Sequence, residues 1–156
     1  MDIPYLIQEQ NSYAGITNKW LGGKAQCICV AFKEMEKFFP ANKIMLTGNP
    51  IRKEVVNIEN RRFEAAEKLS LSPHKKTILV TGGSLGAGTL NKSMMAGLQK
   101  IVAADVQLIW QTGKYYYKPI LEQLAGFQHE NIKVMEFLYS MDLAYAAADV
   151  IISRAG

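Results

Sequence analysis

The fold of this chain is decided by residues 76–91, which read KTILVTGGSLGAGTLN. Its first five residues, 76–80, are mostly apolar and include β-branched side chains, which is typical of a buried strand. Beyond the glycines, from Leu90 to Ile101, apolar residues recur at intervals of four and three, which indicates one face of an amphipathic helix. The stretch therefore predicts a strand, a glycine-rich turn and a helix.

The glycine-rich turn has the features of an anion-binding site. A strand-to-helix turn leaves backbone N–H groups unpaired at the positive end of the helix dipole. Glycine lets a ligand approach the backbone closely, because it has no side chain in the way. Ser84 adds a hydroxyl that can donate to a phosphate oxygen. The alternative is a turn that needs glycine for its shape only.

Composition narrows the class of protein. The chain has 156 residues, of which 49% are hydrophobic and 21% charged, which predicts a globular α/β protein with one domain or parts of two. The net charge of +4 suits anionic substrates or an anionic membrane surface. Basic residues are not clustered among aromatics, so no nucleic acid is expected as a partner. No signal peptide or membrane-spanning apolar run is visible, so a cytoplasmic location is expected.

Metal and disulfide chemistry are not expected from the residues present. Cys27 and Cys29 lie two apart, which is too little for a zinc site and places both on one side of a strand. There is no Asp-x-Asp pair for a metal-bridged nucleotide site, and neither His74 nor His129 has a partner at ligand spacing. We therefore expect no metal and no cofactor.

Strands and helices are expected to alternate along the chain. The expected strands are 3–7, 26–31, 43–46, 76–80, 106–111, 132–137 and 148–152. The expected helices are 33–39, 61–69, 90–101, 116–124 and 141–148. From Thr77 onward this order predicts a parallel sheet with right-handed crossovers and helices on both faces. The polar segment 54–62 is a plausible linker between two Rossmann-like domains, and strand-like segments near both ends predict a piece of a longer chain.

Two polar segments follow predicted strands, where ligands bind in such sheets. Gln8-Glu9-Gln10-Asn11 can bind sugar hydroxyls, and Glu9 can act as a base if its pKa is raised. The alternative is a polar loop that caps the next helix. In Asn49-Pro50-Ile51-Arg52, proline stiffens the turn and Arg52 offers a planar fork for phosphate or carboxylate. A solvated surface arginine is the alternative there.

Eight segments together resemble the MurG family of bacterial peptidoglycan glycosyltransferases. They are QEQN (8–11), AGITNKWL (14–21), GNPIR (48–52), GGSLGA (82–87), LN (90–91), WQTG (110–113), FL (137–138) and SRAG (153–156). They occur in the family's order and cover nearly the whole chain. The resemblance implies a GT-B fold, in which 1–51 ends the acceptor-side Rossmann-like domain and 52–156 forms the first half of the donor-binding domain.

The resemblance also implies an activity and a set of site residues. The family transfers N-acetylglucosamine from UDP-N-acetylglucosamine to undecaprenyl-pyrophosphoryl-N-acetylmuramoyl-pentapeptide, with inversion, at the inner face of the cytoplasmic membrane and without a cofactor. The implied substrate-binding residues are Asn11, Arg52, Gly83, Ser84 and Leu138, with Asn91 and Arg154 near them, and Glu9 falls on a position linked to acceptor handling or catalysis.

Three departures from the family pattern bear on affinity. Gln8 stands where many relatives have histidine, Leu85 where glutamine is common, and Gly88 where arginine is frequent. The family's amino-terminal glycine-rich loop and its uracil-binding segment have no counterpart in these residues. We therefore expect this chain alone to bind donor weakly and to be inactive.

Two alternatives from other classes remain at this stage. Residues 81–88 also fit the T-G-x-x-x-G-x-G turn of NAD(P)-dependent short-chain oxidoreductases, but Asp105 precedes its strand and Lys118 lacks a tyrosine four residues earlier. The basic balance and Tyr115-Tyr116-Tyr117 would also suit a peripheral membrane-binding module without catalysis.

Overall fold

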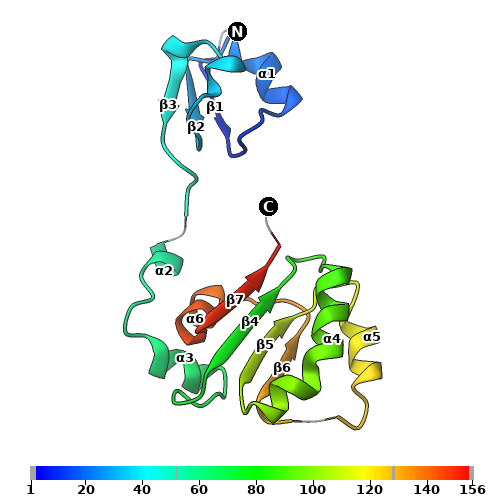
Figure 1. The fold of residues 1–156 in the computed structure, drawn as a ribbon. Helices are drawn as coiled ribbons and strands as arrows, with labels where there is room; N and C mark the ends of the chain where they lie inside the picture. The colour runs from blue at the N-terminus through cyan, green and yellow to red at the C-terminus, as the bar shows by residue number, and fades with distance from the viewer. Residues whose placement is uncertain (1–2, 52, 128, 155–156) are drawn as a thin grey trace. The chain divides into compact units, whose positions relative to one another are not determined.

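The chain folds as two compact units, Met1–Ile51 and Arg52–Gly156, in the computed structural model of the protein (Figure 1). The structure describes residues 3–51, 53–127 and 129–154. Each unit has its own parallel sheet and its own hydrophobic core, so each is described by itself.

The first unit is a three-stranded parallel sheet in the order β1-β2-β3. Its elements are β1 (Leu6–Glu9), α1 (Ile16–Gly22), β2 (Cys27–Val30), the 3-10 helices η1 (Met35–Lys37) and η2 (Ala41–Lys43), and β3 (Ile44–Leu46). Its core is made of Ile7, Ala14, Ala25, Ile28, Val30, Met35 and Phe39.

The second unit is a four-stranded parallel sheet in the order β6-β5-β4-β7. Its elements are α2 (Lys53–Val56), α3 (Arg62–Lys68), β4 (Thr77–Thr81), α4 (Gly88–Ala103), β5 (Gln107–Gln111), α5 (Tyr117–Gln123), β6 (Ile132–Met135), α6 (Met141–Ala147) and β7 (Val150–Ser153). The predicted alternation of strands and helices and the parallel pairing are confirmed here.

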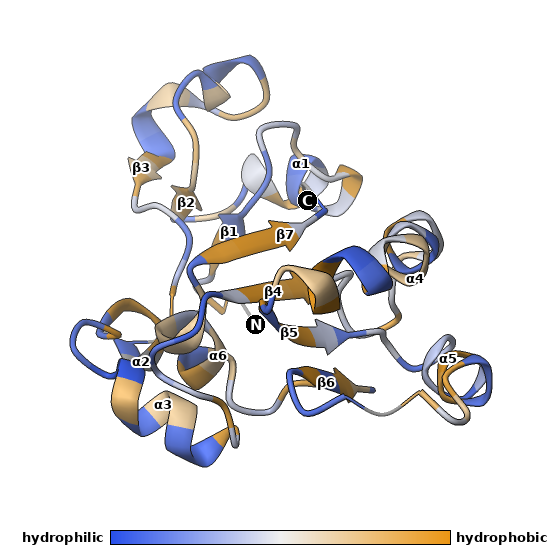
Figure 2. Cartoon of the chain, turned by 60° about the horizontal axis from the view of Figure 1, so that its bottom comes forward, coloured by the Kyte–Doolittle hydropathy of each residue, from blue (hydrophilic) through white to orange (hydrophobic). Residues whose placement is uncertain are grey.

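Alternate residues of the central strands build two cores, one on each face of the second sheet. Leu79 and Ile109 pack against α3 and α6, whereas Val80, Leu108 and Trp110 pack against α4 and α5. Helices therefore cover both faces, as the sequence predicts (Figure 1). The edge strand β7 is apolar, and Figure 2 shows it in orange. Val150, Ile151 and Ile152 are exposed along it.

The sheet order fixes a topological switch point between β4 and β7. From β4 the chain moves outward through β5 to β6, and then crosses to the opposite side of β4 to form β7. Ligands of open α/β sheets bind at the carboxyl ends of strands at such a point. In this unit those ends are Thr81 and Ser153, which are directly paired.

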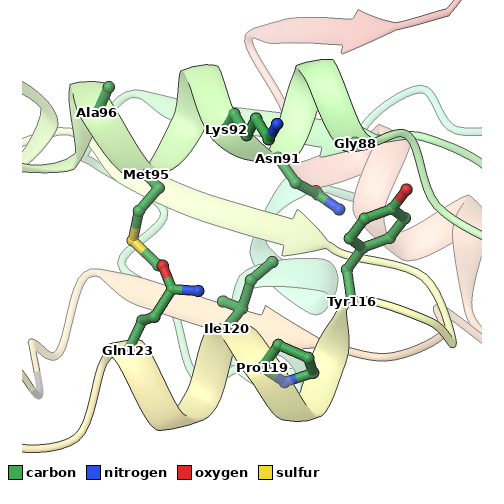
Figure 3. A pocket seen from close by; sticks show the side chains of 9 residues that line it. All are labelled: Gly88, Asn91, Lys92, Met95, Ala96, Tyr116, Pro119, Ile120 and Gln123. Carbon is green, nitrogen blue, oxygen red and sulfur yellow. The ribbon is translucent and has the colours of Figure 1, made fainter.

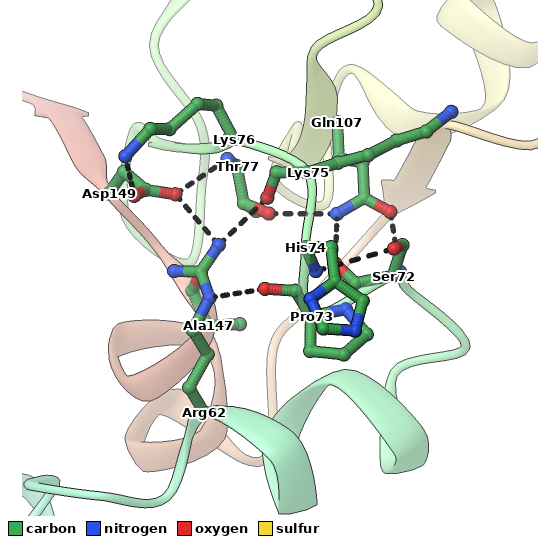
Figure 4. Close-up of polar contacts among 10 residues, drawn as sticks. All are labelled: Arg62, Ser72, Pro73, His74, Lys75, Lys76, Thr77, Gln107, Ala147 and Asp149. Atoms are coloured by element: carbon green, nitrogen blue, oxygen red, sulfur yellow. Dashed lines mark hydrogen bonds and ion pairs between the residues drawn. The ribbon is translucent and has the colours of Figure 1, made fainter.

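The opposite end of the second sheet is held by a polar network (Figure 4). The Arg62 guanidinium donates to the carbonyls of Pro73, Lys75 and Ala147 at 2.8, 2.7 and 3.1 Å, and to Asp149 Oδ2 at 3.0 Å. Asp149 also accepts from the Thr77 N–H at 2.9 Å. Because this network lies at the amino ends of β4 and β7, it ties α3 and α6 to the sheet away from the switch point.

Three local predictions differ from the structure. Residues 33–39 contain the 3-10 helix η1 rather than an α-helix, because Glu34 has a φ of 60° and Pro40 stops the chain from continuing. The expected linker 54–62 contains most of the short helix α2. Helix α1 was not among the predicted helices; Ile16, Trp20 and Leu21 are spaced as on a helix, but they are exposed in the structure.

Candidate functional site

The glycine-rich turn and Arg154 come together at the switch point of the second unit. The turn follows β4 directly, and Arg154 follows β7, whose last residue Ser153 pairs with Thr81. A cavity of about 310 Å³ lies there; its lining is Ala87, Gly88, Thr89, Leu90, Ser93 and Arg154. A guanidinium beside a helix amino terminus is an arrangement that favours an anion.

The turn has the backbone geometry of a phosphate-binding loop. Gly83 and Gly86 have φ values of +83° and +89°, which favour glycine. A β-carbon on Gly83 would meet nothing within 4 Å, so this part of the turn is open. In the described part of α4 no side chain caps the helix and no acidic residue occupies the first turn. The first N–H groups of α4 are therefore suited to an anionic ligand.

A second turn, residues 112–114 after β5, packs against the glycine-rich turn. The Lys114 N–H donates to the Ser84 carbonyl at 3.0 Å. A β-carbon on Gly86 would lie 2.2 Å from the Thr112 carbonyl oxygen, so the two turns touch through backbone atoms. This contact holds the Ser84 backbone in place relative to the end of β5.

Asn91 joins these two turns from the first part of α4. The residue is only 4% exposed. Its Nδ2 donates to the Thr112 carbonyl at 2.8 Å, and its Oδ1 accepts from Trp110 Nε1 at 2.9 Å. Both ends of the amide are thus used inside the protein, although the residue is close to the turn.

The other residues predicted to bind the donor differ in how exposed they are to a ligand. Gly83, Ser84 and Arg154 are exposed at the switch point. Leu138 is 4% exposed and packs in the core with Leu79 and Ile109, so its side chain is not presented to a ligand. Arg52 lies outside the described residues.

Glu9 lies in the first unit, at the end of β1. Gln8 and Glu9 belong to the strand itself rather than following it, and Asn11 is exposed just beyond. The Glu9 carboxylate is buried and accepts hydrogen bonds from Asn11, Gly15 and Asn18. Burial raises the pKa of Glu9, but the hydrogen bonds outweigh it and hold this pKa below its usual value. The raised pKa that a base would need is not what this environment produces.

A second cavity, of about 390 Å³, lies between α4 and α5 (Figure 3). Met95, Ala96, Pro119 and Ile120 make its lining mostly apolar, and the Tyr116 ring closes the end near Gly88. Sequence reasoning did not identify this cavity, because its lining comes from two helices whose contact the pattern does not reveal. Among described residues, no group of three potential metal ligands occurs, and no helix is long and apolar enough to cross a membrane.

Relatives of this chain share its pattern over nearly its full length. A 54% identical protein of Parabacteroides distasonis covers 99% of the chain, and one of Bacteroides fragilis, also 54% identical, covers 100%. Both are named UDP-N-acetylglucosamine--N-acetylmuramyl-(pentapeptide) pyrophosphoryl-undecaprenol N-acetylglucosamine transferase. The chain spans 42% of the length of each of these relatives.

A solved structure and a domain family also match. The crystal structure of Acinetobacter baumannii MurG superposes with a TM-score of 0.61 at 33% identity, over 99% of this chain and 41% of that one. The predicted fold class, α/β of the GT-B type with parts of two Rossmann-like domains, and the predicted relation to the MurG family are confirmed by these likenesses. Residues 77–156 match the Glycosyltransferase family 28 C-terminal domain. The chain therefore belongs to glycosyltransferase family 28.

Proposed function

We propose that this chain is part of an inverting glycosyltransferase that moves N-acetylglucosamine from UDP-N-acetylglucosamine to the undecaprenyl-linked muramoyl-pentapeptide of peptidoglycan synthesis. The names of its relatives support these substrates. The structural observation that carries the proposal is the open glycine-rich turn beside Arg154 at the switch point between β4 and β7. On this proposal, residues 52–156 belong to the donor-binding domain and residues 1–51 to the acceptor-side domain.

The turn would act on the leaving group of the reaction. An acceptor hydroxyl attacks the anomeric carbon and its oxygen forms the new glycosidic bond, while its proton passes to solvent. The bond to the UDP oxygen breaks, and its electron pair leaves with UDP. Negative charge then grows on the pyrophosphate. The N–H groups at the start of α4, the Ser84 hydroxyl and the Arg154 guanidinium are the groups suited to stabilise that charge. Arg52, by its predicted role, would add a second guanidinium.

The experiment that tests the donor site is an amide NMR titration of this chain with UDP-N-acetylglucosamine, with NADP in a parallel sample. We expect shifts in residues 82–91 and 154 with the sugar nucleotide alone. Ser84→Ala should reduce the shift changes caused by the sugar nucleotide. Lys92→Ala, an exposed change one helical turn after the first residue of α4, should leave them unchanged. Shifts with NADP alone would favour an oxidoreductase, and no shift with either ligand would argue against a donor site in this chain.

We further propose that the protein binds the cytoplasmic face of the inner membrane peripherally. The supporting surface is α1 and its neighbourhood, where Trp20 is 80% exposed and Ile16 and Leu21 are also exposed. Lys19 and Lys24 supply positive charge close to these apolar groups. Exposed tryptophan with lysine is a combination that suits an anionic lipid interface.

Vesicle sedimentation tests this membrane proposal. We expect the chain to sediment with phosphatidylglycerol vesicles more than with phosphatidylcholine vesicles, and Trp20→Ser to reduce the bound fraction. Trp20→Phe, which keeps an aromatic ring, is the matched control and should retain most of the binding. Equal binding by the wild type and Trp20→Ser would contradict a role for α1.

A further inference from the structure

The feature that carries a further inference is the hydrogen-bonded carboxylate of Glu9. Oε1 accepts from the Asn11 backbone N–H at 3.1 Å and from Asn11 Nδ2 at 3.2 Å. Oε2 accepts from the Gly15 N–H at 2.8 Å and from Asn18 Nδ2 at 3.0 Å. The residue is 3% exposed, so these four donors replace water around a buried charge.

This arrangement fixes which end of the Asn11 amide faces outward. An ionised carboxylate only accepts hydrogen bonds, so the NH₂ group of Asn11 must face Glu9. The carbonyl oxygen Oδ1 of Asn11 then lies on the other end of the amide, and the residue is exposed. Asn11 is therefore held with its acceptor oxygen turned away from Glu9, while one of its two amide N–H groups is committed to the carboxylate.

The same geometry is unfavourable for proton transfer by Glu9 itself. A general base needs an oxygen within hydrogen-bond reach of the substrate proton and a pKa near the working pH. Both Glu9 oxygens already accept two hydrogen bonds from the protein, and these hydrogen bonds keep the carboxylate charged.

We propose that Glu9 is a positioning residue, which acts by holding Asn11 with its carbonyl oxygen outward to accept a hydrogen bond from a hydroxyl or amide N–H of the sugar substrate. The identity of that ligand rests on the proposed function; the relation between Glu9 and Asn11 does not.

The first arm of the test needs no ligand and no variant. In a pH titration of the labelled chain, the side-chain NH₂ signals of Asn11 and Asn18 should shift with the same acidic midpoint as the Glu9 carboxyl carbon. That midpoint should lie below the usual value for glutamate. The side-chain NH₂ of Gln10, which bonds to Gln8 instead, is the internal control and should not follow it. An Asn11 NH₂ signal that ignores the Glu9 titration would overturn the proposal.

The second arm is a double-mutant cycle on the affinity for UDP-N-acetylglucosamine, measured by NMR. We expect Glu9→Gln and Asn11→Ala each to weaken binding by about 3- to 10-fold, because each removes the oriented acceptor. The double variant should be no weaker than Asn11→Ala alone, and Lys33→Ala, an exposed change elsewhere in the first unit, should match the wild type. Additive losses, or a Glu9→Gln variant with full affinity, would overturn the positioning role. Absence of donor binding by the wild type would argue against a donor site in this chain, while the first arm would still decide the relation between Glu9 and Asn11.

Discussion

Gly86 and Gly113 meet backbone to backbone: a β-carbon on Gly113 would lie 2.1 Å from the Gly86 nitrogen. Gly113 also has a φ of +83°, which disfavours any side chain. The turn that follows β5 thus supports the turn that follows β4, and through it the proposed pyrophosphate site. A residue without any side chain of its own therefore helps to determine the shape of the site.

Replacing Gly113 by alanine should destabilise the second unit and disturb the glycine-rich turn. The positive φ and the backbone clash together should lower the free energy of unfolding by about 3 kcal/mol or more. Urea unfolding in a Trp20→Phe background, which leaves Trp110 as the single indole, measures this change. Gly97→Ala is the matched control: Gly97 lies inside α4 with nothing within 4 Å of its β-carbon position, so it should stabilise by about 0.5–1 kcal/mol. Equal effects of the two substitutions would contradict the packing of the two turns.

Asn91→Asp should destabilise the same region although the shape of the side chain barely changes. One carboxylate oxygen can still accept from Trp110, but the other would face the Thr112 carbonyl, where the wild type donates. A buried acceptor opposite another acceptor should cost about 2–3 kcal/mol of unfolding free energy. Lys92, the next residue in α4, is exposed, so Lys92→Ala should change the free energy of unfolding by less than about 0.5 kcal/mol. If the two variants unfold at the same urea concentration, the Asn91 hydrogen bonds contribute nothing measurable.

The part of the site that could be predicted from sequence is the part that depends on local pattern. The strand, turn and helix of residues 76–91 follow from β-branched residues, glycines and helical spacing, all within one stretch. The buried role of Asn91 does not, because its partner Trp110 lies on β5 and its partner Thr112 in the turn after β5, and both become its neighbours only in the folded unit. Sequence reasoning placed Asn91 near the ligand, and the structure shows both ends of its amide engaged in the protein.

Glu9 illustrates a second limit of sequence reasoning. A polar run after an apolar segment predicts a binding or catalytic loop, but it does not say what surrounds each side chain. Two of the donors to Glu9 come from Gly15 and Asn18, at the start of helix α1, which was not among the predicted helices. The pKa of Glu9 depends on those donors, so its direction was not predictable from the residue type and its neighbours in sequence.

The stability of the second unit should fall as Asp149 is protonated. The hydrogen bond from Lys76 lowers the pKa of Asp149 most, burial opposes it, and the Thr77 N–H and Arg62 add to the lowering, so this pKa falls to about 2. Because this value lies below the unfolded value of about 3.9, the stabilisation is complete above pH 4–5 and is lost as the pH falls toward 2. At pH 6, Asp149→Asn should therefore have a free energy of unfolding about 2 kcal/mol below that of the wild type, as measured by urea unfolding. This difference in stability should close near pH 2.

The control for this pH effect is Glu130→Gln. Glu130 lies 3.9 Å from Lys75 and its side chain is 84% exposed, so its removal should change the urea midpoint little at any pH. A constant gap between the wild type and Asp149→Asn from pH 6 to pH 2 would contradict the assigned role of the Asp149 charge.

Arg62→Lys should destabilise the second unit even though the positive charge is kept. The guanidinium reaches three carbonyls and one carboxylate from its three nitrogens, as Figure 4 shows, and an ammonium cannot reach all four from one position. Losing two or more of these hydrogen bonds should cost about 2–3 kcal/mol of unfolding free energy. Arg61→Lys is the matched control, since Arg61 pairs only with the side chains of Glu64 and Asp142 among described residues and should cost less than about 1 kcal/mol.

Because the Arg62 network lies at the amino ends of the strands, Arg62→Lys should also leave the NMR shifts of residues 82–86 unchanged while the unit is folded. Shifts in that turn would show that the two ends of the sheet are coupled, and would contradict the separation of support and site that the fold implies.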